Sequence, residues 1–347
     1  MEILWFGIIS FMLTMYVILD GFDLGVGVIH RLIGKSETER GILIKSIGPV
    51  WDGNEVWLLA AGGTMYFAFP KLYASSFSGF YLPLMIVLWL LILRATGIEF
   101  RHQIHNPVWK SFWDTVFAVA STLLAIVLGA ALGNVIRGVP LNQDGYFFLP
   151  LWTTFKITSD AGILDWFTIL MGLVSLSTLT MHGSLYIAMK TEGDLQIRAR
   201  NFAKLAWWFA FITSLLSIVG TTYVRPEFWK NYSEFPWGFV FPVVGMATFL
   251  YIYIFTSKKQ DGKAFFSSSI FIASTLLATA FGLFPYLLKS SIEENNSLTV
   301  YNTITGEYGL RVGLVWWIIG IILTSIYFIY IYRSFRGKIN SSTETGY

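Results

Sequence analysis

The sequence predicts an all-α, polytopic membrane protein with nine transmembrane helices. Hydrophobic residues make up 55% of the 347 residues and charged residues only 13%, whereas typical soluble proteins carry about a quarter charged residues. Nine segments approach the length of about 20 apolar residues that crosses a bilayer core. Basic residues gather in the loops of one side. These observations predict one helical domain, 1–347, within a membrane.

The nine predicted helices are separated by short polar, glycine-containing or proline-containing loops. The longest loops, near 137–161 and 289–311, are too short and irregular to form a soluble domain. The amino terminus has no basic region followed by a small-residue cleavage site, so we expect the first apolar stretch to be retained as a helix. The predicted helices cover residues 3–29, 50–69, 77–97, 112–135, 162–189, 203–224, 236–256, 264–288 and 312–333.

The distribution of Lys and Arg predicts the orientation. If the amino terminus lies outside, 17 of the 24 basic residues fall on the cytoplasmic side, as the positive-inside rule requires. An odd number of helices then places the carboxyl terminus in the cytoplasm. The basic residues on the outer side are Lys71, Arg137, Lys156, Arg225, Lys230, Lys289 and Arg311.

Composition also excludes several functions. The chain has no Cys, so it cannot form disulfides, thiolate-bound zinc sites or iron–sulfur clusters. The net charge of +3 is spread over short loops, and no basic run suits nucleic acid. His30, His102 and His105 fall in or beside cytoplasmic loops, and only His182 lies inside a predicted helix. A haem with two axial ligands needs a facing pair, so we expect His182 to be hydrogen-bonded within the bundle and expect no metal site.

Two carboxylates in the first helix require an explanation, because a charge at a bilayer centre costs about 2.5–3.5 kcal/mol even on lenient scales. Asp20 and Asp23 are three residues apart and share a helix face near the cytoplasmic end. Gly21 and Gly25 form a small-residue pair that lets another helix approach closely. One interpretation is that both acids handle protons. The alternative is that Asp23 is a solvated helix-end residue and Asp20 pairs with an Arg.

The second helix repeats this pattern after Pro49, which suits the start of a helix. Asp52 and Glu55 are again three residues apart, with Glu55 deeper. The helix macrodipole alone is an alternative explanation for Asp52, but less so for Glu55. If the two helices are adjacent, Asp20, Asp23, Asp52 and Glu55 form a cluster in which like charges and burial favour proton uptake. The sequence therefore predicts a proton pathway through these four acids.

The third helix ends on the same side with Arg94, Glu99 and Arg101. Arg keeps its charge in proteins, so Arg94 either pairs with Asp20 or Asp23, or extends to the lipid headgroups. We expect these three residues to support the acids as ion-pair partners.

Ordered motifs along nearly the whole chain resemble those of subunit II of cytochrome bd-type quinol oxidases. The two most specific are residues 19–27 and 48–57, which contain the four acids. They are followed by Gly62-Gly63, Phe69-Pro70, Tyr73-Ala74, Arg94, Glu99-Phe100-Arg101, Gly133-Asn134, Gly138-Val139-Pro140, Phe284-Pro285 and Ser297-Leu298-Thr299.

This resemblance implies two four-helix bundles plus one peripheral helix, paired with a similarly folded subunit I in a bacterial plasma membrane. Subunit I of that family carries two b-type haems and one d-type haem, and the complex reduces oxygen to water with cytoplasmic protons. This chain would then be a subunit of an oxidoreductase without haem ligands, and inactive when isolated. Some complexes also contain a small third transmembrane subunit, and some members hold a structural quinone, whose residues here are not identified.

The resemblance assigns Asp20, Asp23 and Asp52 to positions associated with a proton path near the subunit interface, with Arg94 close by. Glu55 is less specific, because an uncharged amide occupies this position in some members. Two other functions remain as alternatives. A purely structural scaffold explains the fold but not four acids on one side, and a secondary transporter predicts charges near the midplane and broken helices.

Overall fold

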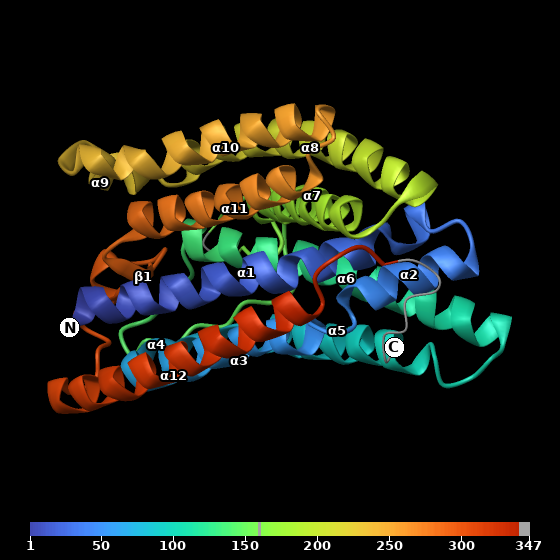
Figure 1. The fold of residues 1–347 in the computed structure, drawn as a ribbon. Coiled ribbons are helices and arrows are strands. Elements are labelled where there is room, and N and C mark those ends of the chain that lie inside the picture. The colour runs from blue at the N-terminus through green and yellow to red at the C-terminus, as the bar shows by residue number, and fades with distance from the viewer. Residues whose placement is uncertain (159–160, 340–347) are drawn as a thin grey trace.

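The computed structural model describes residues 1–158 and 161–339, and nearly all of its regular structure is helical (Figure 1). The all-α prediction is confirmed. In the described ranges the elements are α1 (Glu2–Ile33), α2 (Glu37–Ile47), α3 (Trp51–Ala68), α4 (Pro70–Gly79), α5 (Tyr81–Phe100), α6 (Pro107–Arg137), α7 (Trp166–Lys190), α8 (Gly193–Val224), η1 (Pro226–Trp229), α9 (Lys230–Glu234), η2 (Pro236–Phe239), α10 (Val240–Ser257), α11 (Asp261–Leu283), β1 (Tyr286–Leu288), η3 (Glu294–Asn296), β2 (Leu298–Thr299) and α12 (Glu307–Ser334).

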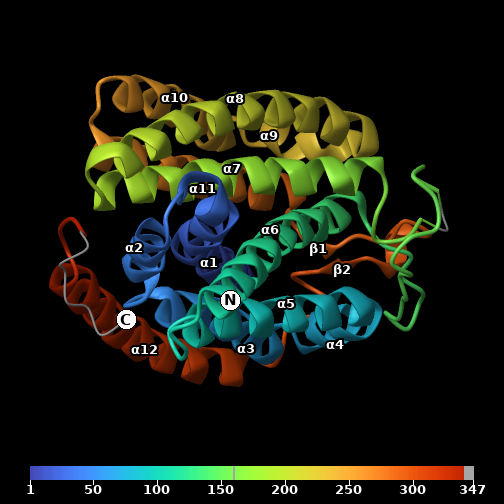
Figure 2. The same ribbon diagram turned by 90° about the vertical axis from the view of Figure 1, so that its right-hand side faces the viewer.

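The long helices fall into two groups, and α1 and α6 of the first group pack against α7 of the second. Helices α1, α3, α5 and α6 form one group, and α7, α8, α10 and α11 form the other. Figure 2 shows α7, α8 and α10 above α1, with α3, α5 and α12 below it. This arrangement matches the expected pair of four-helix bundles with a peripheral helix, α12. We name the two ends of the helices by the short elements there: the α2 end and the α9 end (Figure 1).

Eight helices in the described residues are long and apolar enough to cross a membrane: α1, α5, α6, α7, α8, η2 with α10, α11 and α12. The predicted ninth helix, α3, has 18 residues but is not apolar enough to be counted with these eight. Its first turns contain Asp52, Asn54 and Glu55. The number of nine crossings therefore stays a prediction.

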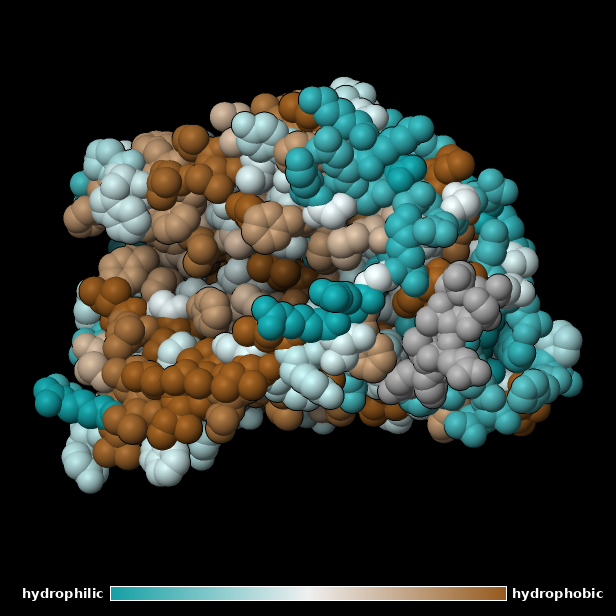
Figure 3. All heavy atoms as spheres, viewed as in Figure 1, coloured by the Kyte–Doolittle hydropathy of each residue, from teal (hydrophilic) through white to brown (hydrophobic). Residues whose placement is uncertain are grey.

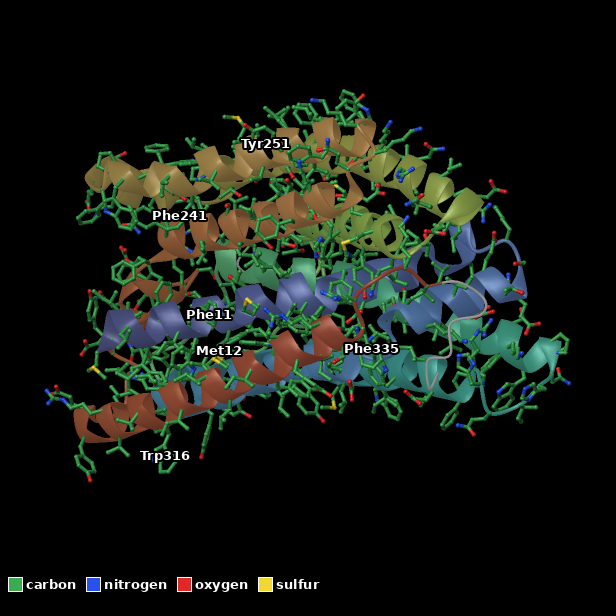
Figure 4. The ribbon with its side chains drawn as sticks, viewed as in Figure 1. Phe11, Met12, Phe241, Tyr251, Trp316 and Phe335 are labelled. Atoms are coloured by element: carbon green, nitrogen blue, oxygen red, sulfur yellow. The ribbon has the colours of Figure 1, made fainter. Side chains whose placement is uncertain are left out.

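The surface has the character of a protein embedded in lipid. Figure 3 shows hydrophobic side chains along α12 and hydrophilic ones toward the α2 end. Trp316 of α12 is 69% exposed and Tyr251 of α10 is 50% exposed, and they point outward from opposite sides of the helices (Figure 4). Apolar clusters lie inside, and in one of them Leu24 of α1 packs with Leu179 of α7.

Several predicted boundaries are wrong by one turn or more. α7 begins at Trp166 rather than 162, because the Asp165 carboxylate accepts hydrogen bonds from the first turn and Thr168 completes a capping box. The predicted helix over 50–69, in contrast, agrees with α3 (Trp51–Ala68) within one residue at each end. α8 begins at Gly193 and α12 at Glu307, both earlier than predicted.

Two elements contradict the predicted helix pattern more strongly. The helix predicted over 264–288 ends at Leu283, and residues 286–288 form β1, which pairs antiparallel with β2. Residues 70–79 form the separate helix α4, whose first residue is Pro70. Proline suits the first turn of a helix because it has no N–H to leave unpaired there.

Candidate functional site

The acidic pair of the first helix lies where α1 is enclosed by other helices. Asp20 and Asp23 are 0% and 1% exposed. α1 approaches α7 closely here, because a Cβ added to Gly25 would lie 2.0 Å from the Leu179 carbonyl oxygen and 2.8 Å from the Gly183 nitrogen. The predicted close approach at Gly25 is confirmed, whereas the alternative that Asp23 is a solvated helix-end residue is wrong.

Arg94 joins α1, α3 and α5 through two carboxylates. Its Nη1 donates to Asp20 Oδ1 at 2.5 Å and its Nη2 donates to Glu55 Oε2 at 2.8 Å. The Arg94 and Asp20 side chains are fully buried, while the Glu55 side chain is 25% exposed. The predicted pairing of Arg94 with Asp20 is therefore confirmed. Glu55 provides a connection from this buried pair to the surface.

Asn54 connects Asp23 to the peripheral helix. Its Nδ2 donates to Asp23 Oδ2 at 2.8 Å and to the Leu19 carbonyl oxygen at 3.3 Å, and its Oδ1 accepts from the Tyr332 hydroxyl at 2.9 Å. Asn54 itself is fully buried. The sequence interpretation did not include Asn54 or Tyr332. Asn54 was visible as a polar residue inside the acidic motif, but nothing local indicated that α12 would reach it.

Three carboxyl groups therefore lie close to one guanidinium. Asp20 and Glu55 contact Arg94, and Asp23 is held beside them by Asn54. Asp20 Oδ2, Asp23 Oδ1 and Arg94 Nε are buried without a hydrogen-bond partner in the described part of the chain. Carboxyls therefore outnumber cations in this group, and an unpaired charge in a dry site is costly. We call Asp20, Asp23, Glu55 and Arg94 the Arg94 cluster.

Asp52 does not join the Arg94 cluster, so the prediction of four clustered acids is wrong in this respect. Asp52 is exposed, and its Oδ1 accepts from the Gly53 backbone nitrogen at 2.7 Å. It lies in the first turn of α3, where the macrodipole favours an acid. One turn separates it from Glu55, the exposed member of the cluster.

Arg101 pairs with Asp114 and not with the predicted acids of the first two helices. Its Nε donates to Asp114 Oδ1 at 2.6 Å, which also lies 2.6 Å from His30 Nε2, and Asp114 Oδ2 accepts from Arg40 Nε at 2.9 Å. We call these four residues the Asp114 cluster. Its contacts join α1, α2 and α6 to the end of α5. Glu99 is half-buried and takes part in no ion pair in the described ranges.

Sequence reasoning missed Asp114, Arg40 and His30 as members of a site. Asp114 is a single carboxylate inside the predicted helix 112–135, and this position could have indicated a buried polar site. His30 was assigned to a loop, but α1 continues to Ile33 and His30 is fully buried. His102 follows α5 beside this group, where burial, with the charge of Arg101 adding to it, lowers its pKa.

The ring nitrogens of His182 are not free to bind a haem iron. His182 Nε2 lies 3.0 Å from the Ile18 carbonyl oxygen and Nδ1 lies 2.7 Å from Ser268 Oγ, so both ring nitrogens have partners. Phe265 stacks on the ring at 4.7 Å. The prediction that His182 is hydrogen-bonded within the bundle is confirmed. In the described residues, no group of three or more His, Asp or Glu side chains is placed to bind a metal ion.

Comparisons with known proteins agree on one family. The family model described as cytochrome bd terminal oxidase subunit II matches residues 1–335. A probable cytochrome oxidase subunit 2 from Haemophilus influenzae is 32% identical over 99% of this chain and 96% of its own length. Subunit 2 of the cytochrome bd-I ubiquinol oxidase of Escherichia coli K12 is 31% identical over 95% of this chain and 92% of its own length.

A further relative and a solved structure extend the comparison. Subunit 2 of the cytochrome bd ubiquinol oxidase of Bacillus subtilis is 32% identical over 89% of this chain and 88% of its own length. A chain of the bd oxidase from Geobacillus thermodenitrificans has the same fold, with a TM-score of 0.75 over 96% of this chain and 98% of that chain, at 18% identity.

Proposed function

The chain belongs to the family of cytochrome bd terminal oxidase subunit II, and on that premise we propose that it provides a proton pathway to a haem-bearing partner subunit. As a member of this family it is a multi-pass protein of the bacterial plasma membrane and part of an oxidoreductase complex. In our proposal the haems lie in subunit I, and the isolated chain has no oxidase activity. The α2 end faces the cytoplasm, and both termini follow the predicted orientation.

One observation carries the proposal: Arg94 bridges the buried Asp20 and the partly exposed Glu55. A proton that reaches Glu55 from the surface has a second carboxyl 2.5 Å from the same guanidinium. Asp23 follows Asp20 by three residues on the same face of α1. The excess of carboxyls over cations gives the group the capacity to hold a proton. Asp52, exposed one turn before Glu55, would collect protons at the surface.

Residues of this chain hold the carboxyl groups of the proposed path in fixed orientations. Arg94 keeps its charge and orients both carboxyls, while Asn54 fixes one oxygen of Asp23. The unpartnered oxygens of Asp20 and Asp23 are suited to hydrogen bonds with water, because a buried water needs two to four polar partners. The haem of the partner subunit supplies the oxygen chemistry, and this chain delivers protons toward it.

The two alternative functions, a secondary transporter and a structural scaffold, require different structural features. A secondary transporter requires broken helices at its ion site, but α1 is continuous from Glu2 to Ile33. A pure scaffold needs ion pairs but no surplus of carboxyls. A structural quinone and a small third subunit remain compatible with the proposal, and neither is needed for it.

The proposal is tested in the whole oxidase complex with Asp52→Asn. Assembly and haem content should be retained, while oxygen-reduction turnover and proton uptake fall together. The control is Asp194→Asn, because Asp194 is also exposed near the start of a helix at the α2 end. Unchanged turnover in Asp52→Asn would remove Asp52 from the pathway and favour the scaffold.

A further inference from the structure

A second polar site lies at the α9 end, opposite the Arg94 cluster. A cavity of about 360 Å³ opens there between the end of α6, the end of α8 and the segment after β1. This volume lies at the lower end of the range for ligand sites, about 300–1,000 Å³. Its polar lining includes Arg137, Arg225, Glu227, Lys289, Ser290 and Ser291.

The floor of the cavity is a fixed piece of backbone. The Val139 nitrogen donates to the Lys289 carbonyl oxygen at 2.9 Å, and the Ser291 nitrogen donates to the Val139 carbonyl oxygen at 2.9 Å. Gly138 has a φ of 93°, a conformation that favours glycine, and it allows α6 to end against Lys289. The two polar segments that line the cavity are therefore held together without help from a ligand.

Among the described residues that line the cavity, cations outnumber acids. Arg137 is neutralised, because its Nη1 donates to Asp165 and its Nη2 donates to Asn134 Oδ1 at 2.8 Å. Arg225 and Lys289 share the carboxylate of Glu227. Lys289 Nζ contacts Glu227 Oε1 directly, whereas Arg225 Nε lies 3.7 Å from the same oxygen. Within this described lining, Arg225 is therefore the more weakly neutralised cation.

Arg225 contributes a buried nitrogen to this site that makes no hydrogen bond in the described part of the chain. Its side chain is 3% exposed, its Nη1 donates to the Ile136 carbonyl oxygen at 3.1 Å, and its Nε is buried without a hydrogen-bond partner in the described ranges. Burial lowers the pKa of Arg225 to about 10. Burial and the charge of Arg225 also lower the pKa of Lys289. Both shifts would be relieved by an anion.

The cavity lies where helices that can cross a membrane end. α6 and α8 are both apolar enough to cross a membrane, and they end at Arg137 and Val224, beside the cavity. The cavity is therefore placed at the depth of lipid headgroups.

From these observations we propose that the cavity binds a phosphate group, supplied by the headgroup of an anionic phospholipid. Arg225 Nε and Lys289 would donate to the phosphate oxygens, and the exposed Ser291 would add a hydroxyl. Basic pockets between membrane helices are suited to anionic headgroups. The proposal does not depend on proton transfer at the opposite end.

The test uses the delipidated oxidase complex with two probes. In the first arm, phosphatidylglycerol and phosphatidylcholine nanodiscs are compared by native mass spectrometry of the retained lipid. In the second arm, inorganic phosphate is titrated and followed by ³¹P NMR line broadening. Arg225→Gln and Lys289→Gln should each weaken phosphatidylglycerol retention by at least about fivefold, the effect of one basic residue near a membrane surface, without changing phosphatidylcholine retention.

Lys230→Gln is the matched control, because Lys230 is at the same end but 71% exposed and paired with Glu234. It should leave retention unchanged. Lys289→Gln keeps the test valid if Arg225→Gln fails to assemble, since Lys289 is 21% exposed. Binding of inorganic phosphate without preferential lipid retention, if it requires Arg225 and Lys289, supports the phosphate site and identifies free phosphate as its source. If neither probe binds in a manner that depends on these two residues, the proposal is wrong.

Discussion

Arg94 and Arg101 lie two helical turns apart near the end of α5, but they stand in opposite electrostatic surroundings. Carboxyls are in excess around Arg94, and two carboxyl oxygens there lack partners in the described part of the chain. Around Asp114, in contrast, the two cations Arg40 and Arg101 face one carboxylate, and both of its oxygens accept hydrogen bonds. In our proposal the acid-rich group exchanges protons, whereas the group around Asp114 holds helices in place.

The largest expected effect on stability is that of Asp114→Asn. Removing the carboxylate leaves Arg40 and Arg101 close together without their shared counter-charge, and breaking a buried ion pair in this way costs about 3–5 kcal/mol. Denaturation of the detergent-solubilised complex, followed by helical circular dichroism, should show this loss together with poor assembly.

Asp144→Asn is the control for this variant, since Asp144 is an exposed carboxylate in a loop. It should leave stability unchanged. If Asp114→Asn assembles normally and denatures like the parent complex, the Asp114 cluster does not clamp the helices.

The next largest effect is expected from Gly25→Ala, which acts on both clusters through α1. The added Cβ would lie 2.0 Å from the Leu179 carbonyl oxygen, so α1 and α7 must separate, and overpacking of this kind typically costs about 1–3 kcal/mol. Stability and oxidase turnover should fall together, because α1 carries Asp20 and His30. Thermal unfolding and oxygen consumption measure both.

Gly7→Ala on the same helix is the matched control, because nothing lies within 4 Å of a Cβ added there. Ala has the higher helix propensity, so this variant should be neutral or slightly stabilised. Equal losses in Gly7→Ala and Gly25→Ala would show that helix propensity, and not the contact with α7, is being measured.

The smallest effect concerns pH and His102 beside the Asp114 cluster. Because burial lowers the pKa of His102 in the folded protein, the unfolded chain binds more protons below about pH 6.5, its ordinary value. Stability attributable to His102 is therefore present at neutral pH and falls as the pH decreases through this range. His102→Gln should flatten the decline in melting temperature between pH 7 and pH 5, and an unaltered slope would show that His102 does not contribute.

The sequence indicated the members of the Arg94 cluster, although it wrongly added Asp52 and left two possibilities for Arg94, because a charge in an apolar segment is conspicuous wherever it occurs. Asp20, Glu55 and Arg94 each stand out in this way, and consecutive helices tend to pack together. Asn54 and Tyr332 were missed because their contact joins residues 278 positions apart, and nothing in either segment indicates the position of α12.

The remaining errors also have physical causes. The segment 286–288 is hydrophobic and continues a helical pattern, so its pairing with β2 could not be read locally. The short helix α2 is polar, and its capping box at Ser36 and Glu39 was the available signal for it. Without α2, the position of Arg40 relative to Asp114 could not be predicted.

Proton uptake by Glu55→Gln tests the central claim most directly. Glutamine keeps an oxygen that accepts from Arg94 but cannot carry a proton, so assembly and haem content should be preserved. In the complex reconstituted into liposomes, with uptake followed by a pH-sensitive dye on the α2 side, proton uptake and turnover should both fall by at least about tenfold, the low end of proton-transfer effects. Uptake and turnover equal to those of the parent complex would contradict the account.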